Sequence, residues 1–452
     1  MKHAVIRLAA LLSAAVLLTA LLAACAPKAE VSSASSEAAS SAAAKQTAFV
    51  PQLDTEAAVN LEVSGFFGNF EALDQIINAF NEYYPNVTVS YEQNNGAKLV
   101  EYMKNNPSVD IVMVDDTNLR YSDWTEYYVL DRLADLSAEN VDLSALQEDL
   151  LPYCTYDGKV VDIPIGLNLS GMVVNETLLR KEGLEVPTTW QEFLDVCAAL
   201  KEKGYTPIQG ARTMVYSELV YNMAMAELGS DPALIEALNN GNDTAVAAME
   251  TVYSRLQTLL DEGYTDPDLN AEYPDDNYDG AILRFFEGDV PFWVCNTEKF
   301  SGMKKRESKS ETYSADPFDY EFIYAPLGDD GAYEYVEPWF GFAVNKNSDD
   351  YDYAIEFMRF LARSEQLDTM ASVKGVPTAS RSGVDERYPA IHNTEKVEKR
   401  VVNEGSVLNH MKDYFRNDAS KLASGKLADA KAAAEDYVSR CAETAREMVA
   451  VN

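Results

Sequence analysis

An alternation of strand-like and helix-like segments constrains the fold of this chain more than any other feature. Residues 59–65 alternate apolar and polar side chains and end at a glycine, as a half-buried strand does. Residues 70–83 repeat apolar side chains at helical spacing, and a second strand is predicted at 87–91. A short helix at 98–104 and a third, apolar strand at 110–114 follow. This βαβαβ order predicts an α/β protein in which helices cover a parallel sheet.

The loops after the first and third strands hold candidate ligand-binding residues, because such sheets bind ligands beyond the carboxyl ends of their strands. The first loop contributes Phe66, Phe67 and Asn69, and the other contributes Asp115 and Asp116. Aromatic rings pack against the apolar faces of sugars, while amides and carboxylates bind hydroxyl groups. Core packing of the phenylalanines and helix capping by the aspartates are the structural alternatives.

The first 25 residues have the pattern of a lipoprotein signal peptide. Lys2 and Arg7 precede the uncharged run 8–24, which ends in small residues before Cys25 and resembles the bacterial lipobox. A transmembrane helix is the alternative, although about 17 apolar residues are at the lower limit for spanning a bilayer. The placed cysteine favours cleavage, so we predict a signal peptide over 1–24 and a diacylated, palmitate-bearing Cys25. This lipid would hold the protein at the outer face of the cell membrane.

A tether follows the predicted lipid anchor. Residues 25–48 are mostly alanine, serine, lysine and glutamate, a composition that cannot form a core. We therefore expect a flexible leash that carries a folded domain just outside the membrane.

Charge and composition exclude several functions. The chain has 37 Lys+Arg against 73 Asp+Glu, a formal net charge of −36, and would repel nucleic acids and anionic membrane surfaces. Membrane contact is therefore expected through the lipid anchor only. Three histidines leave little material for metal binding or acid–base catalysis, and no GxSxG, HExxH or P-loop motif occurs. We predict that the protein is no enzyme and uses neither cofactor nor metal.

One segment resembles the opening of a calcium-binding loop. Residues 275–280 (DDNYDG) fit the first half of an EF-hand, but Phe286 stands where the template requires glutamate. An acidic cap for the next helix is the alternative, favoured by the helix dipole.

The cysteines after Cys25 follow no metal-binding spacing. Cys154, Cys197, Cys295 and Cys441 are widely separated, and the sequence does not choose among their possible pairings. Cys197 lies in an apolar helical stretch, so we expect it to be a buried free thiol.

Several short motifs, taken together and in order, point to one family. They are residues 156–164 (YDGKVVDIP), 171–175 (GMVVN), 182–187 (EGLEVP), 188–193 (TTWQEF), 285–292 (FFEGDVPF), 343–348 (AVNKNS), 374–378 (KGVPT) and 422–427 (LASGKL). In this order they resemble the bacterial extracellular solute-binding proteins of the sugar-binding, maltose-binding-protein-like class (family 1). Thr188 is also a credible N-cap for the helix that follows it.

The resemblance implies a hinged, two-lobed periplasmic-binding-protein-like fold of type II, with a ligand cleft between the lobes. The chain would cross between the lobes near residues 164–168, 337–340 and 375–380. The first lobe would then comprise 49–165 and 337–375, and the second lobe would comprise 166–336 and 376–452.

Further ligand candidates lie at these crossings and in the second lobe. Asn168 stands where relatives often place a polar ligand contact, and Trp339 could form one wall of the site or pack between the lobes. Arg212 and Tyr216 lie in a loop of the second lobe. Relatives usually carry a glycine and then a stacking aromatic after the 285–292 motif, but here the loop reads CNTE (295–298), with Asn296 and Glu298 as ligand candidates and a carboxylate in place of the aromatic. This substitution keeps an oligosaccharide as the first choice of ligand but admits a cationic, polyol or peptide-like solute.

The predicted function is therefore that of a lipid-anchored, monomeric solute receptor of an ABC importer. It would capture a carbohydrate and deliver it to the transmembrane permease subunits. A surface lipoprotein that degrades carbohydrate, or a binding protein that feeds a sensor, are the alternatives.

Overall fold

The computed structural model describes most of residues 48–449. The excluded internal stretches are 68–69, 95–98, 115–128, 157, 212–213, 229–230, 274–277, 330, 382–390, 393–396 and 403–411. Five predicted site residues therefore lie outside the described part: Cys25, Asn69, Asp115, Asp116 and Arg212. None of the helices in the described part is long and apolar enough to cross a membrane.

The βαβαβ start predicted from the sequence is confirmed. Its elements are β1 (Val59–Gly65), α1 (Glu71–Asn81), β2 (Val87–Gln93), α2 (Leu99–Asn105) and β3 (Ile111–Val114). β2 and β3 pair with β1 in parallel. The apolar face of α1 is buried, as its periodicity requires.

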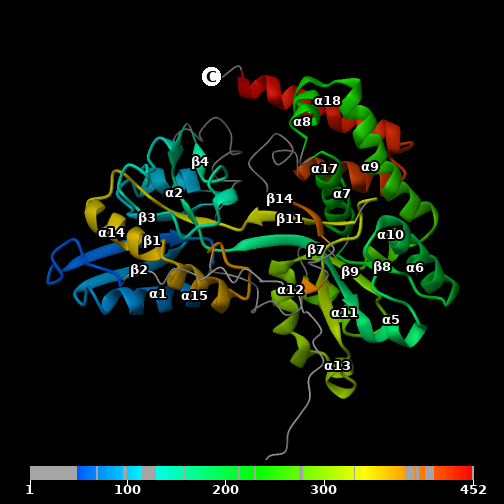
Figure 1. Ribbon diagram of the computed structural model, residues 1–452, viewed down its shortest axis with the longest axis horizontal. Helices are drawn as coiled ribbons and strands as arrows, with labels where there is room; N and C mark the ends of the chain where they lie inside the picture. The colour runs from blue at the N-terminus through cyan, green and yellow to red at the C-terminus, as the bar shows by residue number, and fades with distance from the viewer. Residues whose placement is uncertain are drawn as a thin grey trace, which may run out of the picture. The chain divides into compact units, whose positions relative to one another are not determined.

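Two strands from much later in the chain complete this first sheet. β12 (Gly341–Val344) pairs antiparallel with β3, and β6 (Ile163–Pro164) pairs antiparallel with β12. The strand order is therefore β2-β1-β3-β12-β6. Two late helices also join this lobe (Figure 1): α14 (Tyr351–Leu361) contacts β1 and β12, and α15 (Ser364–Lys374) contacts α1.

The second sheet is built around the long strand β7 (Leu167–Asn175). One edge of β7 pairs with β9 (Phe292–Asn296). The other edge pairs first with β11 (Ala332–Pro338) and then with β10 (Tyr320–Ile323). Short strands extend this sheet: β8 (Ile208–Gln209), β13 (Ile391–His392) and β14 (Val397–Val402). A separate small hairpin joins β4 (Thr155–Tyr156) to β5 (Lys159–Val160).

Helices surround the second sheet, and α7 is buried almost all round because it packs against α9 and α17 as well as the sheet. The helices that follow β7 in this part of the chain are α5 (Glu176–Glu182), α6 (Trp190–Glu202), α7 (Met214–Glu227), α8 (Pro232–Asn240), α9 (Asp243–Asp261), α10 (Pro267–Asn270), α11 (Tyr278–Phe285), α12 (Thr297–Lys304), α13 (Glu311–Ala315), α17 (Lys412–Ala423) and α18 (Ala430–Val449). Among these helices, α18 and α9 pack against each other most extensively.

The N-cap predicted at Thr188 is one residue early. Thr189 caps α6, because its hydroxyl accepts a hydrogen bond from the Glu192 backbone N–H at 3.3 Å. Thr188 instead donates its own backbone N–H and its hydroxyl to the Glu192 carboxylate, both at 2.8 Å. The two threonines thus share the work of a capping box, and the helix starts at Trp190.

The chain passes between the two sheets at two neighbouring segments, which are hydrogen-bonded to each other. It leaves the first sheet after β6 and returns to it after β11. The Trp339 N–H donates to the Gly166 carbonyl at 3.0 Å, and the Ile165 N–H donates to the Phe340 carbonyl at 3.0 Å. A Cβ atom on Gly166 would lie 2.8 Å from Val376 Cγ2, so glycine allows a third segment to approach here.

The segment after α15 stays beside the first lobe as far as Arg381. The Gln147 side-chain amide donates to the Thr378 carbonyl at 2.8 Å, and the Gln147 N–H donates to the Ala379 carbonyl at 3.0 Å. The Arg381 N–H likewise donates to the Ala145 carbonyl at 2.7 Å. These bonds attach the segment to residues that precede the first crossing.

The cysteines in the described part are buried and form no disulfide. The buried free thiol predicted for Cys197 is confirmed, and burial raises its pKa strongly. In the suspected calcium segment, residues 275–277 lie outside the described part. Asp279, which is described, bonds the Arg306 guanidinium at 2.6 Å and thereby serves an ion pair.

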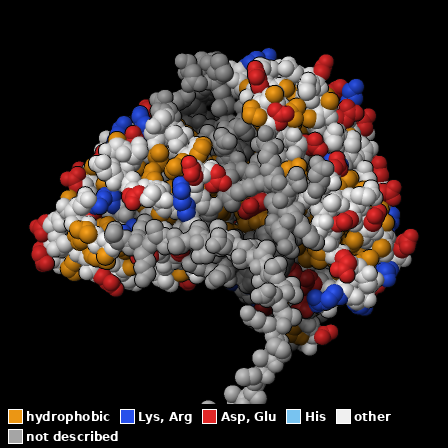
Figure 2. Space-filling model, in the orientation of Figure 1, with side chains coloured by type: hydrophobic (Ala, Val, Ile, Leu, Met, Phe, Trp, Pro, Cys, Tyr) orange, Lys and Arg blue, Asp and Glu red, His pale blue; other side chains and the backbone are white. Residues whose placement is uncertain are grey.

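Acidic side chains dominate the exterior, as the net charge of −36 requires. Figure 2 shows Asp and Glu side chains spread over the visible face rather than gathered in one patch. On this face the acidic charges are distributed among several elements of the fold.

Candidate functional site

Aromatic side chains from the first loop and the second crossing meet at the edge of the first sheet. The Phe67 ring lies 5.7 Å from Trp339 and 5.2 Å from Phe340, measured between ring centres, and Phe66 lies 6.4 Å from Phe340. Phe67 also stacks on Phe70 at 5.4 Å. We call these five residues the aromatic cluster. The structure thus brings the predicted site residue Trp339 next to two others, Phe66 and Phe67, from which it is far apart in the sequence.

Two hydrogen bonds between the Tyr91 hydroxyl and the Phe67 backbone hold Phe67 in place. The Tyr91 hydroxyl accepts from the Phe67 N–H and donates to the Phe67 carbonyl, both at 3.0 Å. A Cβ atom on Gly65 would lie 2.6 Å from this hydroxyl, so only glycine lets Tyr91 reach the loop. The end of β1 therefore fixes the position of the cluster.

Trp339 occupies the crossing itself and is half-buried. One contact is with its neighbour Phe340, whose ring centre lies 4.4 Å away, and its backbone is bonded to Gly166. Packing and an accessible ring surface therefore coexist at this residue. Its role as a wall of the ligand site stays a prediction.

Lys374, the last residue of α15, was not among the predicted site residues. Its ammonium nitrogen lies 4.5 Å from the centre of the Phe67 ring, 4.9 Å from Phe70 and 5.8 Å from Trp339. Burial lowers the pKa of Lys374, the nearby Lys305 lowers it further, and Glu298 is one of the carboxylates that raise it. The lysine therefore lies over the aromatic cluster, and the Glu298 carboxylate on α12 acts on it from a distance.

A polar group lies at the start of β7 and α12. The Asn168 side-chain oxygen Oδ1 accepts from the Glu298 backbone N–H at 3.4 Å, and the Glu298 carboxylate is exposed. Asn296 is buried and caps α12, because its side-chain oxygen accepts from the Lys299 N–H at 3.1 Å. Asn296 therefore has a structural role as a helix cap, and its predicted ligand contact stays a prediction.

Further polar groups lie beside Asn168 and were not predicted from the sequence. The Ser170 hydroxyl donates to the buried Glu218 carboxylate at 3.1 Å and accepts from the Asn222 amide at 2.8 Å. Glu337 lies opposite Asn168 in the pairing of β11 with β7. The available signal was a glutamate and an asparagine four residues apart in the otherwise apolar helix α7, since buried polar groups require partners.

Tyr216 points elsewhere. Its ring is buried in the second core, and its hydroxyl accepts from the Asn270 amide at 3.1 Å. Burial raises the pKa of Tyr216 to about 12. Tyr216 and Glu218 are two residues apart on α7, which separates them by about 200° around the helix. The structure therefore does not bring Tyr216 to the group around Asn168.

The assembled groups suit recognition rather than reaction. Aromatic rings can pack against a sugar ring, and amides, carboxylates and an ammonium can bind its hydroxyls. In the part of the chain that the structure covers, no three His, Cys, Asp or Glu side chains are grouped as metal ligands would be.

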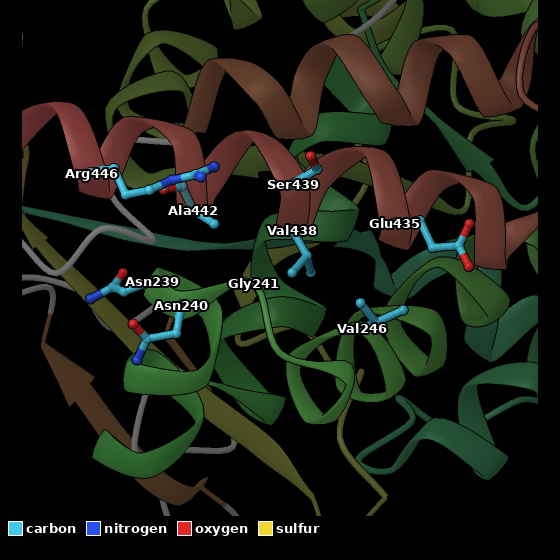
Figure 3. A pocket seen from close by; sticks show the side chains of 9 residues that line it. All are labelled: Asn239, Asn240, Gly241, Val246, Glu435, Val438, Ser439, Ala442 and Arg446. Atoms are coloured by element: carbon cyan, nitrogen blue, oxygen red, sulfur yellow. The ribbon is translucent and has the colours of Figure 1, made fainter.

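A separate surface pocket of about 330 Å³ lies between α8, α9 and α18 (Figure 3). Its lining consists of Asn239, Asn240, Gly241, Val246, Glu435, Val438, Ser439, Ala442 and Arg446. None of these side chains is aromatic, and none is a predicted site residue. The pocket offers no ring on which a sugar could stack, so the group around Trp339 and Asn168 is the better candidate site.

Comparison with known proteins defines the class of this protein. Residues 75–399 match the family model of the bacterial extracellular solute-binding proteins, and the chain belongs to this family. The predicted family resemblance is thereby confirmed. Members of this class bind solutes and are not enzymes.

Similar individual proteins agree with this result. A stretch of 156 residues is 26% identical to a probable sugar-binding periplasmic protein of Rhizobium meliloti; it covers 33% of this chain and 37% of that protein. The match therefore spans little more than a third of that relative's length.

Solved structures share the fold. The sugar-binding protein MalE from Xanthomonas citri superposes with a TM-score of 0.69 at 15% identity, covering 87% of this chain and 98% of that one. A sugar transporter from Bacillus licheniformis, solved with stachyose, gives 0.61 at 18% identity, covering 84% of this chain and 98% of that one. These likenesses confirm the predicted two-lobed α/β fold.

Proposed function

We propose that this protein captures a carbohydrate, most simply an oligosaccharide, at the site formed by the aromatic cluster, Asn168 and Glu298. The observation that carries the proposal is the placement of half-buried rings beside amide and carboxylate groups where the chain crosses between the sheets. Sugars present exactly these two surfaces, an apolar ring face and a rim of hydroxyls. The printed names of the relatives and the stachyose complex of one structural neighbour support this choice.

The lobes and their hinge are part of the proposal. β6 and β12 belong to the first sheet and β7 and β11 to the second, which supports crossings near residues 164–168 and 337–340. The Leu167 N–H donates to the Pro377 carbonyl at 2.8 Å, which supports a third crossing near residues 375–380. Ligand contacts from both lobes would favour a closed arrangement over an open one.

We further propose that the protein acts outside the cytoplasm as a monomer, anchored through Cys25, and delivers its ligand to the permease of an ABC importer. The lipobox and tether in the sequence support the anchor. Family membership supports delivery to a transporter.

A thermal-shift screen of residues 48–452 against neutral, acidic and amino sugars, polyols and peptides tests the proposal. A ligand at 100 times its dissociation constant should stabilise the protein by about 2.7 kcal/mol. Stabilisation by a sugar that is recovered intact after incubation is the expected result. Cleavage of a glycan, or stabilisation by peptides alone, would refute the proposal.

A further inference from the structure

The ammonium of Lys374 is a feature of the candidate site that binding of a neutral sugar leaves unexplained. The side chain is half-buried, and its nitrogen lies within 6 Å of the ring centres of Phe67, Phe70 and Trp339. Ring faces attract a cation, so these contacts hold the charge in one place. The Lys374 carbonyl also accepts from the Ser301 hydroxyl at 2.9 Å, which fixes the backbone to α12.

This charge has no carboxylate partner among the described residues. No carboxylate oxygen there lies within the 4.0 Å that defines an ion pair with Lys374. Lys304 provides the contrast, because it also lies over a ring, that of Tyr320 at 4.3 Å, but is paired with Glu307 at 3.1 Å. Glu71 and Glu298 act on Lys374 only at longer range.

A half-buried ammonium without a counter-ion is costly, and such groups cluster at functional sites. An ammonium can donate up to three hydrogen bonds, and those it makes to an ionised acceptor are stronger than those to a neutral hydroxyl. An anionic ligand group would therefore gain more from this position than a neutral one.

We propose that Lys374 is a specificity-determining residue that selects a sugar bearing a carboxylate, that is, a uronic acid or an oligosaccharide containing one. The carboxylate pairs with the ammonium while the sugar ring contacts Trp339 and its hydroxyls meet Asn168 and Glu298. This inference rests on the proposed carbohydrate-binding function and names the ligand class of the same site.

Matched sugars that differ only in the acid group test it. Glucuronate and galacturonate, as monomers and short oligomers, are compared by calorimetry with their neutral glucose and galactose counterparts. The parent protein should bind the acidic member of a pair about tenfold more tightly. Lys374→Met, which keeps the aliphatic stem over the rings, should lose this ratio, because it weakens binding of the acidic sugar far more than binding of the neutral sugar.

Three variants complete the design. Lys305→Met removes an exposed charge that acts on Lys374 without lying over the cluster, and it should keep the ratio. Lys374→Arg preserves the charge and should preserve most of the preference. Lys374→Gln also removes the charge and should lose the ratio, which keeps the test decisive if Lys374→Met fails to fold.

The outcomes separate this inference from the proposed function. Equal binding of neutral and acidic sugars, or a ratio unchanged in Lys374→Met, overturns the role of Lys374 and leaves carbohydrate binding intact. Tighter binding of a cationic amino sugar also overturns it, because the rings would then accept a ligand cation in place of the lysine. Binding of none of the sugars would refute the proposed function itself.

Discussion

Replacement of Trp339 by alanine is the sharpest test of the candidate site. The residue lies at the crossing between β11 and β12, and its ring touches both Phe67 and Phe340. If the exposed part of the indole forms a wall of the site, Trp339→Ala should weaken ligand binding at least about tenfold, or about 1.4 kcal/mol. Truncation of a buried tryptophan at a binding site commonly costs 2 kcal/mol or more, so this is a lower bound.

The same change should also cost some stability without ligand. Each aromatic pair contributes about 0.5–1.5 kcal/mol beyond area burial, and Trp339 makes two such pairs, so the expected loss is about 1–3 kcal/mol. Trp339→Phe keeps a ring at this position and should recover part of both losses. Trp339→Ala should therefore still fold and should melt a few degrees lower than the parent.

Calorimetry and intrinsic fluorescence, with a ligand found in the thermal-shift screen, measure the two effects separately. Trp190→Ala is the matched control. Trp190 is the first residue of α6, and it packs against Phe193 and against Arg255 of α9, away from the aromatic cluster. The control should lose stability and bind normally. Trp339→Ala with parental affinity, and a ligand-induced fluorescence change as large as that of the parent, would show that Trp339 is only a packing residue.

Three further predictions address the anchor, the first lobe and the crossing. Cys25→Ala should abolish metabolic labelling with palmitate and release the protein or leave its precursor unprocessed, whereas continued labelling would refute the lipobox; the folded domain should melt as before. Tyr84 is fully buried and bonded to Glu356, and burial, followed by this bond, raises the pKa of Tyr84 to about 12 from 10.0. The stability that neutral Tyr84 contributes is therefore complete below pH 10 and is lost between pH 10 and about 12. Over this range the unfolding free energy of Tyr84→Phe, measured with denaturant, should fall less steeply with pH than that of the parent. Parallel plots of unfolding free energy against pH for the two proteins would contradict the prediction. Gly166→Ala should cost about 1–3 kcal/mol of unfolding free energy through the 2.8 Å approach to Val376, and addition of Val376→Ala should recover part of it rather than add a second full loss.

Local patterns predicted the start of the fold well because they require no knowledge of distant residues. The period of two in β1 and the helical period in α1 are properties of their own segments, and Pro85 marks the break before β2. The predicted N-cap was one residue early, at Thr188 rather than Thr189, because two adjacent threonine hydroxyls can both cap a helix. Which strands lie beside β3 was not readable, since pairing with β12 depends on packing between segments far apart in the chain.

The site shows the same division. Phe66, Phe67 and Trp339 were recognisable because aromatic residues at strand ends and crossings stand out from the pattern. Lys374 was missed because a lysine in the last turn of a helix ordinarily serves the helix dipole in solvent, and only tertiary contacts reveal the rings beneath it.

The position of β12 in the first sheet bears on how the chain acquires its structure after synthesis. β3 lies between β1 and β12, so its second edge stays open until Gly341–Val344 becomes available. A chain threaded through a membrane from its N-terminus would therefore present an incomplete first lobe during most of its passage. Pairings across such long sequence separations form slowly. The same delay leaves an unpaired strand edge exposed to other chains while the first lobe is incomplete.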